Sequence, residues 1–126
     1  MTSDEFLKLR DELEESARAA LVEKGKEYTR SGDDKLSNFK KRAEEAGVTV
    51  RQAWSLYAGK HWDSIMNWAK GGDFGSEPAI QRFGDLRNYL ELGFAIYVEE
   101  ESLRALALYS SDSSAAGHEP LSENYD

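Results

Sequence analysis

The chain has 126 residues, of which 24 are acidic and 16 are basic, and its formal net charge at pH 7 is -8. This length is typical of one domain with a single hydrophobic core. Because the sequence contains no cysteine, it excludes disulfides, thiolate metal sites and cysteine nucleophiles. No apolar run approaches the roughly 20 residues of a membrane span, so we expect a soluble, cytoplasmic protein without a membrane partner.

Acidic charge is concentrated at the C-terminal end of the chain. Residues 110–126 carry four acidic groups and no basic one, which is half of the net charge. The segment 28–60 is basic, with seven basic groups against four acidic ones. Binding to duplex nucleic acid is not expected, because it requires a basic surface that displaces counterions from phosphates. A small phosphorylated ligand is compatible with this distribution.

The first part of the chain carries the signals of two helices. Thr2 or Ser3 can cap a first helix that runs to about Tyr28, and small polar residues at 29–34 then favour a turn. A shorter helix is expected over Leu36–Ala46, because Gly47 is a typical C-terminal stop. The apolar residues of the first helix recur at helical spacing, and they are Phe6, Leu9, Leu13, Ala17, Ala20 and Leu21.

Two further long helices follow. Thr49 should cap a helix that ends at Gly71-Gly72 and carries an aromatic face, formed by Trp54, Tyr57, His61, Ile65 and Trp68. Ser76-Glu77-Pro78 is a helix start signal, and the last helix should run to about Tyr109. Its apolar stripe consists of Ile80, Phe83, Leu86, Leu90, Phe94 and Tyr97.

These patterns predict an all-α fold, a small helical bundle of three long helices plus a shorter one. Residues 1–109 should form a single domain, and residues 110–126 a flexible, disordered acidic tail. Five large apolar side chains should be buried, namely Trp54, Trp68, Phe83, Leu90 and Phe94. Because small helical domains often complete their core by self-association, we also expect a homodimer or a higher homo-oligomer.

Several acidic residues lie on helix faces that should approach the core. Asp85 shares a partly apolar stripe with Leu92 and Ile96, and a buried carboxylate must be paired, hydrogen-bonded or bound to a metal. Glu23 and Glu27 form an i,i+4 pair near the end of the first helix. If the first and last helices pack antiparallel, these acids could meet around Mg²⁺, which prefers oxygen ligands. The alternative is that they are solvated, as acids on charged helices usually are.

Lys60 and His61 each admit two interpretations. Lys60 either contacts a phosphate or extends its stem over apolar surface. His61 is either a hydrogen-bonded residue at the edge of the core or an acid–base group. One or two aromatic rings could form a stacking wall for a base. The other cations of this cluster are Lys24, Lys26, Lys35, Lys40, Lys41 and Arg51.

Four short motifs, taken together, resemble those of phage-encoded MazG-like domains in the all-α nucleoside triphosphate pyrophosphatase superfamily. They are Lys26-Glu27-Tyr28, Ser37-Asn38-Phe39, Lys60 followed by Ile65, and Asp85 with Asn88-Tyr89-Leu90. The resemblance spans about residues 21–100. It implies a Mg²⁺-dependent helical bundle that assembles into dimers or tetramers, and for a phage protein it implies the host cytoplasm as its location.

The residue patterns and the resemblance together give expected roles for individual residues, and the resemblance itself concerns Glu27, Asn38, Phe39, Lys60 and Asp85. Glu27 and Asp85 would be catalytic, and together with Glu23 they would hold the metal, which activates water and neutralises charge on the phosphates. The expected substrate-binding residues are Lys24, Tyr28, Asn38, Phe39, Lys60, His61, Asn88 and Tyr89. The sequence departs from the family pattern, because Asn88 replaces a second acid, Thr29 follows Tyr28 in place of glycine, and Ser37 replaces a glutamate.

Three functions follow as hypotheses. The first is hydrolysis of a nucleoside triphosphate to monophosphate and pyrophosphate. The second is a nucleotide or cyclic-nucleotide sponge without catalysis, used by a phage in counter-defence, which the missing acids favour. The third is an acidic protein-interaction module that mimics DNA, and it is weakened because so much of the negative charge lies in the last residues.

Overall fold

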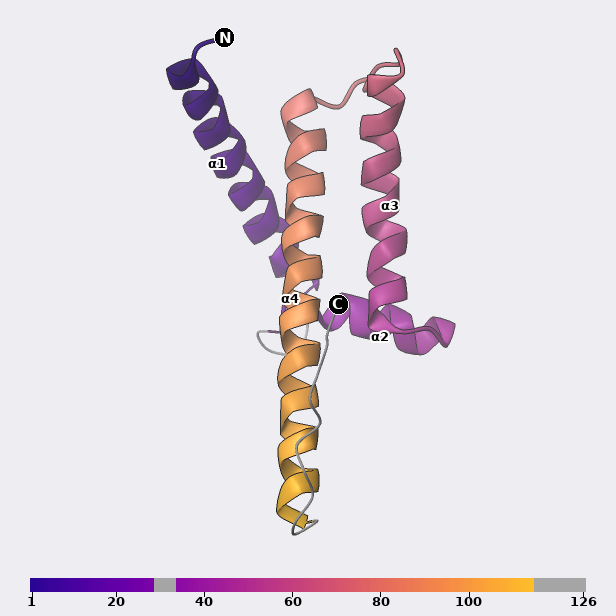
Figure 1. Ribbon diagram of the computed structural model, residues 1–126. Coiled ribbons are helices and arrows are strands. Elements are labelled where there is room, and N and C mark those ends of the chain that lie inside the picture. Colours follow the sequence, from indigo (N-terminus) through magenta and orange to yellow (C-terminus); the bar gives the residue numbers. More distant parts are fainter. Residues whose placement is uncertain (29–33, 115–126) are drawn as a thin grey trace.

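The computed structural model describes residues 1–28 and 34–114, with the backbone alone for residues 25–28 and 112–114. Every regular element in these ranges is a helix, as the sequence predicts. The four helices are α1 (Ser3–Tyr28), α2 (Ser37–Ala46), α3 (Val50–Ala69) and α4 (Ala79–Ser114) (Figure 1). None of the helices described is long and apolar enough to cross a membrane.

Local chemistry sets most of the helix ends. The Thr2 hydroxyl accepts a hydrogen bond from the Glu5 amide, and the Glu5 carboxylate accepts one from the Thr2 amide, which satisfies two donors at the start of α1. Thr49 and Gln52 form the same reciprocal capping box at α3. Gly47 ends α2 in the left-handed conformation, with φ of 67°, which glycine adopts without steric cost. These three ends confirm the sequence-based boundaries.

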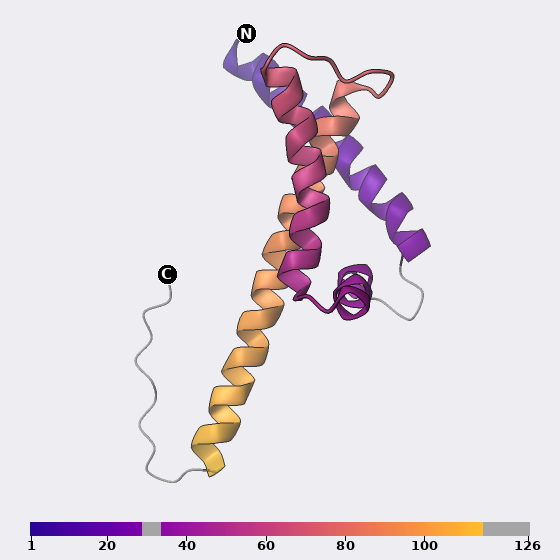
Figure 2. The same cartoon turned by 90° about the vertical axis from the view of Figure 1, so that its right-hand side faces the viewer.

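The helices are arranged around α4. α3 and α4 lie side by side and antiparallel, and α2 lies across the end where α3 begins (Figures 1 and 2). α1 crosses α4 while running in the same direction, so the antiparallel packing on which the predicted metal site depended is not found. The two helices approach closely because small residues meet at the crossing: a side chain at Gly84 would begin 3.6 Å from Ala17.

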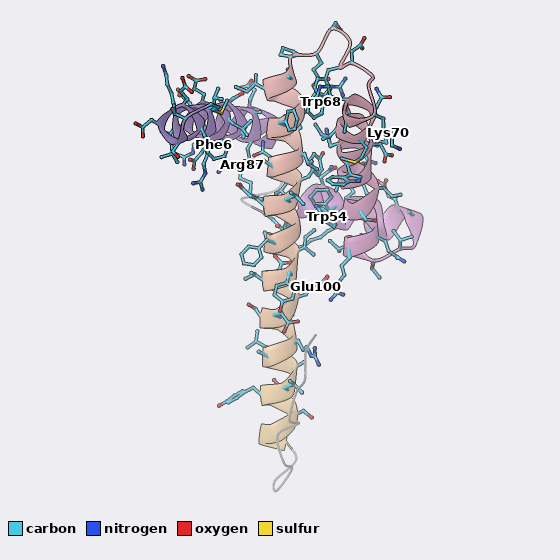
Figure 3. The ribbon with its side chains drawn as sticks, turned by 45° about the horizontal axis from the view of Figure 1, so that its top comes forward. Phe6, Trp54, Trp68, Lys70, Arg87 and Glu100 are labelled. Atoms are coloured by element: carbon cyan, nitrogen blue, oxygen red, sulfur yellow. The ribbon has the colours of Figure 1, made fainter. Side chains whose placement is uncertain are left out.

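The core lies between α2, α3 and α4. Leu36, Phe39 and Ile96 are its buried centre, and partly buried apolar residues pack around them, namely Val50, Trp54, Tyr57, Tyr89 and Leu92. Trp54 lies between α3 and α4 (Figure 3), and its indole N–H donates to the Tyr89 carbonyl at 2.7 Å. Because a buried indole N–H needs an acceptor, this bond fixes the ring beside the core.

The prediction of which side of α4 is buried was wrong. Leu90 is 58% exposed and Phe94 is 67% exposed, and Trp68 on α3 is 49% exposed. Trp54 and Phe83 are only partly buried. The face of α4 that packs inward instead carries Asp85, Asn88, Tyr89, Leu92 and Ile96, which we call the inner face. We call the residues Leu90, Phe94, Tyr97 and Val98 the outer stripe.

The last helix is longer than the sequence predicted. It ends at Ser114, whereas the change to serine, alanine and acidic residues had placed its end near Tyr109. Residues 110–114, assigned to the acidic tail, are therefore helical. The rest of the predicted tail, residues 115–126, lies outside the described residues. Beyond Glu100, α4 extends away from the other three helices (Figures 1 and 3).

Candidate functional site

A group of polar side chains meets where α1, α3 and α4 come together. We call Lys24, His61, Asp85 and Asn88 the polar cluster. Asp85 is 5% exposed, and its carboxylate accepts a hydrogen bond from the Lys24 ammonium at 3.4 Å. A buried carboxylate needs such a partner, because an unpaired charge would lose its hydration without compensation. Lys24 therefore stabilises Asp85 in the position where the sequence predicted a metal ligand.

Asn88, the second buried polar residue, has a structural role. It is 6% exposed, and its side-chain amide donates a hydrogen bond to the Ala17 carbonyl at 2.8 Å. This bond joins α1 to α4 at their crossing, one turn from Asp85. Because the backbone of α1 is held here, the bond also fixes how the end of α1 presents Lys24 to Asp85.

Aromatic rings connect the polar cluster to the core. The His61 ring stacks on the Tyr89 ring at a centroid distance of 4.6 Å, and Tyr89 stacks with Tyr57 at 6.3 Å. Phe39 meets both tyrosines edge-on, at 5.9 Å from Tyr57 and 6.1 Å from Tyr89. These offset and edge-on contacts are the favourable geometries for aromatic pairs. The rings therefore form one packed layer that reaches from α2 to His61.

The surroundings of His61 favour its neutral form. Burial lowers the pKa of His61 below the usual 6.5, and the positive charges of Lys24 and Arg82 act in the same direction. The negative charges of Asp85 and Glu77 oppose this shift. Because burial is the largest influence, the ring is held mainly uncharged at neutral pH.

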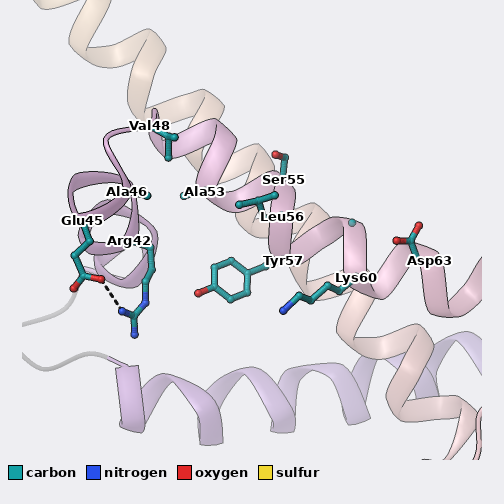
Figure 4. Close-up of a pocket in the computed structure, with 11 residues that line it drawn as sticks. Arg42, Glu45, Ala46, Val48, Ala53, Ser55, Leu56, Tyr57, Lys60 and Asp63 are labelled. Carbon is teal, nitrogen blue, oxygen red and sulfur yellow. Dashed lines mark hydrogen bonds and ion pairs between the residues drawn. The ribbon is translucent and has the colours of Figure 1, made fainter.

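An open cavity of about 710 Å³ lies between α2 and α3 (Figure 4). Arg42 from α2 and Tyr57 and Lys60 from α3 point into it, and the Arg42 guanidinium pairs with Glu45 at 2.8 Å. The rest of the wall is mostly small or apolar, with Ala46, Val48, Ala53, Ser55, Leu56, Gly59 and Asp63. Tyr57 belongs both to this cavity and to the ring layer, so it links the cavity to the polar cluster.

A network of ion pairs joins α2 to α4. The Lys40 ammonium contacts Asp34 at 2.7 Å and Glu99 at 2.6 Å. The hydrogen bond from Lys40 lowers the pKa of Asp34, and the Leu36 amide, which donates to the same carboxylate, adds to the shift. The pKa of Lys40 is raised by its bonds to Asp34 and Glu99. Lys40, named among the candidate cations, is thus occupied in structural contacts.

The predicted site residues are only partly brought together. Lys24, His61, Asp85, Asn88 and Tyr89 do meet, from three helices. Lys60 lines the cavity, whereas the lysine that pairs with Asp85 is Lys24.

The other predicted site residues lie elsewhere. Asn38 is half-buried on α2, and Phe39 is a core residue whose 4% exposure leaves almost no surface for a ligand. Glu23 is exposed, and the side chains of Glu27 and Tyr28 lie outside the described residues.

Sequence reasoning missed Arg42 as a residue of the cavity. It follows Lys40 and Lys41 directly, so three consecutive basic residues carry the same charge signal. Which of them faces α3 depends on how α2 is rotated against α3, and this is set by tertiary packing.

The described side chains offer few ligands for the predicted magnesium site. No group of three histidine or acidic side chains suited to a metal ion occurs among the side chains of residues 1–24 and 34–111. Asp85 provides one carboxylate, and it is paired with an ammonium group. These donors alone do not make up the oxygen-rich shell that Mg²⁺ prefers.

No family model, curated protein or solved structure significantly matches this chain. The likeness to MazG-like domains therefore stays a prediction that rests on the sequence motifs.

Proposed function

We propose that this chain binds a nucleotide, or a related phosphorylated small molecule, in the cavity between α2 and α3. The observation that carries this proposal is that Arg42, Lys60 and the Tyr57 side chain face the same cavity from two helices. Guanidinium and ammonium groups bind phosphate oxygens through charge-assisted hydrogen bonds. An aromatic ring beside them offers a surface on which a base can stack.

The size and lining of the cavity support the same proposal. Its volume of about 710 Å³ falls within the roughly 300–1,000 Å³ that is usual for small-molecule sites. Its wall is largely apolar with a few charged groups, which is also the usual composition of such sites. Lys60 is exposed, so its ammonium can reach a phosphate without first breaking a buried contact. Such a ligand fits a role in the cytoplasm, or in the host cytoplasm if the chain is phage-encoded.

Hydrolysis is the enzymatic form of this proposal, and the sponge is its non-catalytic form. The polar cluster lies beside the ring layer, of which Tyr57 lines the cavity. His61, held neutral, is suited to accept a proton. The pairing of Asp85 with Lys24 favours binding over hydrolysis, because that carboxylate is already compensated by a positive charge. We therefore propose binding as the function and treat pyrophosphate release as the separate result that would extend it to catalysis.

Thermal unfolding in the presence of nucleotides tests the binding proposal. A panel of nucleoside mono-, di- and triphosphates and cyclic nucleotides, with and without Mg²⁺, should contain at least one ligand that raises Tm, because a ligand of the native state stabilises it. Arg42→Ala and Lys60→Ala should each reduce this rise. Lys70→Ala is the matched control, since Lys70 is exposed at the end of α3 and does not line the cavity.

Two results would decide between the forms of the proposal. Pyrophosphate release in Mg²⁺ that is lost in Asp85→Asn would support the enzyme, whereas a rise in Tm without release would support the sponge. If no nucleotide raises Tm, or if Lys70→Ala weakens binding as much as Lys60→Ala, the cavity is not the proposed site.

A further inference from the structure

An acidic residue lies beside the basic groups of the cavity between α2 and α3. Glu45 lines this cavity, and its carboxylate accepts a hydrogen bond from the Arg42 guanidinium at 2.8 Å (Figure 4). The bond raises the pKa of Arg42, with a further contribution from Tyr57. Glu45 therefore already occupies part of the guanidinium that would bind a phosphate.

The Arg42 guanidinium can still bind a phosphate while it holds Glu45. Its bond to Glu45 uses one terminal nitrogen, Nη1, whereas a guanidinium has five N–H donors in a planar fork. The Arg42 and Glu45 side chains are each 49% exposed, so the ion pair is weak and can adjust to a ligand. A phosphate on the remaining donors would lie next to the Glu45 carboxylate, which would repel its negative charge.

The charges that line the cavity can be added. Arg42 and Lys60 are positive and Glu45 is negative, so these three groups have a net charge of +1. Asp63 also lines the wall, although its carboxylate points away from Lys60 (Figure 4), and with it the sum is zero. Attraction to fixed charges grows in proportion to the charge of a ligand, whereas the cost of removing its hydration grows with the square of that charge. The cavity therefore compensates one negative charge better than two.

Two common forms of phosphate differ in this charge. A terminal phosphate is a monoester, and at pH 7 it carries a charge of about −1.5 to −2. A phosphodiester has one ionisable proton and carries a single negative charge. The charge balance around Arg42 and Lys60 therefore favours the diester.

We propose that the cavity selects a nucleotide whose phosphate is a diester with a single negative charge, and that Glu45 disfavours a terminal phosphate. This inference rests on the proposed function, because it names the ligand class of the same cavity. Glu45 is then a specificity-determining residue that acts by its charge. A cyclic mononucleotide and a linear dinucleotide both provide such a diester.

Isothermal titration calorimetry of the full chain without Mg²⁺ tests the ligand class. The probes are a nucleoside 5′-monophosphate and the methyl ester of the same phosphate, for each of the four common bases. The two probes differ in one methyl group and about one charge, and the ester should bind about fivefold more tightly. A monophosphate or triphosphate that binds as tightly as the ester would overturn the inference. Tighter binding of either a 3′,5′-cyclic monophosphate or a linear dinucleoside monophosphate supports it and identifies the source of the diester.

Glu45→Gln tests the residue, because it removes the charge and keeps the size of the side chain. It should shift the ratio of the two affinities toward the monophosphate by about fivefold. Glu44→Gln is the matched control, since Glu44 is an exposed neighbour on α2 that does not line the cavity, and it should leave the ratio unchanged. Each ratio is measured within one variant, so a change in stability affects both affinities alike.

The failure of this inference differs from the failure of the proposed function. An unchanged ratio in Glu45→Gln, or an equal shift in Glu44→Gln, overturns the role of Glu45 while nucleotide binding stands. If the wild-type chain binds none of these ligands, the proposed function is wrong, and the inference fails with it.

Discussion

The inner face and the outer stripe of α4 differ in burial, and the order is the opposite of what hydrophobicity alone would predict. The inner face contains two polar residues, Asp85 and Asn88, yet it is the buried one. The outer stripe contains only apolar and aromatic side chains, yet about half or more of each is exposed. The polar residues are buried because each has a specific partner on α1: Lys24 for Asp85 and the Ala17 carbonyl for Asn88. Which face of α4 is buried thus follows the partners available on the neighbouring helices and not hydrophobicity alone.

The largest expected effect comes from removing the centre of the core. Ile96→Ala should lower the free energy of unfolding by about 2–5 kcal/mol, because it leaves a cavity next to Phe39. Phe94→Ala, two residues away on the outer stripe, should change it by only about 0.5 kcal/mol, because the ring is 67% exposed. Urea unfolding of both variants at submicromolar protein measures this contrast, and equal losses would show that both faces are buried within one chain.

A smaller loss is expected from the hydrogen bond that ties α1 to the inner face. Asn88→Ala should cost about 1–3 kcal/mol, because the buried hydrogen bond that joins α1 to α4 is lost. Asn67→Ala is the control, since Asn67 is exposed and its bond to the Asp73 carbonyl is long, at 3.4 Å. Denaturant unfolding monitored by circular dichroism compares the two. A loss in Asn67→Ala as large as that in Asn88→Ala would contradict the role assigned to the crossing.

Two helical glycines, Gly93 and Gly59, differ in the space around them. A Cβ at Gly93 would overlap the Trp54 ring, so Gly93→Ala should destabilise the fold by about 1–2 kcal/mol after the gain in helix propensity is subtracted. At Gly59, on α3, nothing lies within 4 Å of the added carbon, and Gly59→Ala should stabilise by up to about 1 kcal/mol. Thermal unfolding should therefore shift in opposite directions, and a stabilised Gly93→Ala would mean that Trp54 packs elsewhere.

The smallest effect concerns pH. Because burial lowers the pKa of His61, the unfolded chain binds a proton at this residue at a higher pH than the folded chain does. The stability that the neutral His61 ring contributes to the folded state is therefore fully present above about pH 6.5, and it is lost as the pH falls below this value. Urea unfolding at pH 7.5 and pH 5.5 should show a smaller loss on acidification in His61→Gln than in the wild type. Identical losses in the two proteins would contradict the burial of this ring.

Local sequence signals were sufficient for the fold class and for several helix ends. Thr49, Gly47 and Thr2 act through their own backbone neighbourhood, so their roles could be read without any tertiary information. The faces of α4 could not be assigned in this way, because both have apolar residues at helical spacing. Which face of α4 is buried depends on contacts with Trp54 and Ala17, which lie far away in the sequence.

The candidate site was predictable to a similar extent. The pattern of polar residues on the last helix correctly indicated that Asp85 is buried. The cluster of cations, the aromatic face of the third helix and the quoted motifs named Lys24, His61 and Tyr89 respectively, and these residues do lie near it. The pattern could not show that an ammonium pairs with that carboxylate. It also could not show that Lys60 belongs to a different cavity with Arg42, because both facts depend on how the helices are rotated against one another.

The arrangement of Trp54 gives this protein a built-in spectroscopic probe. Its indole is hydrogen-bonded and partly buried between α3 and α4, whereas Trp62 and Trp68 are 52% and 49% exposed. A water-soluble quencher such as iodide should quench the two outer indoles more strongly than the inner one. The fluorescence that survives quenching then reports mainly on the junction of α3 and α4, next to the ring layer and the cavity, without any added label.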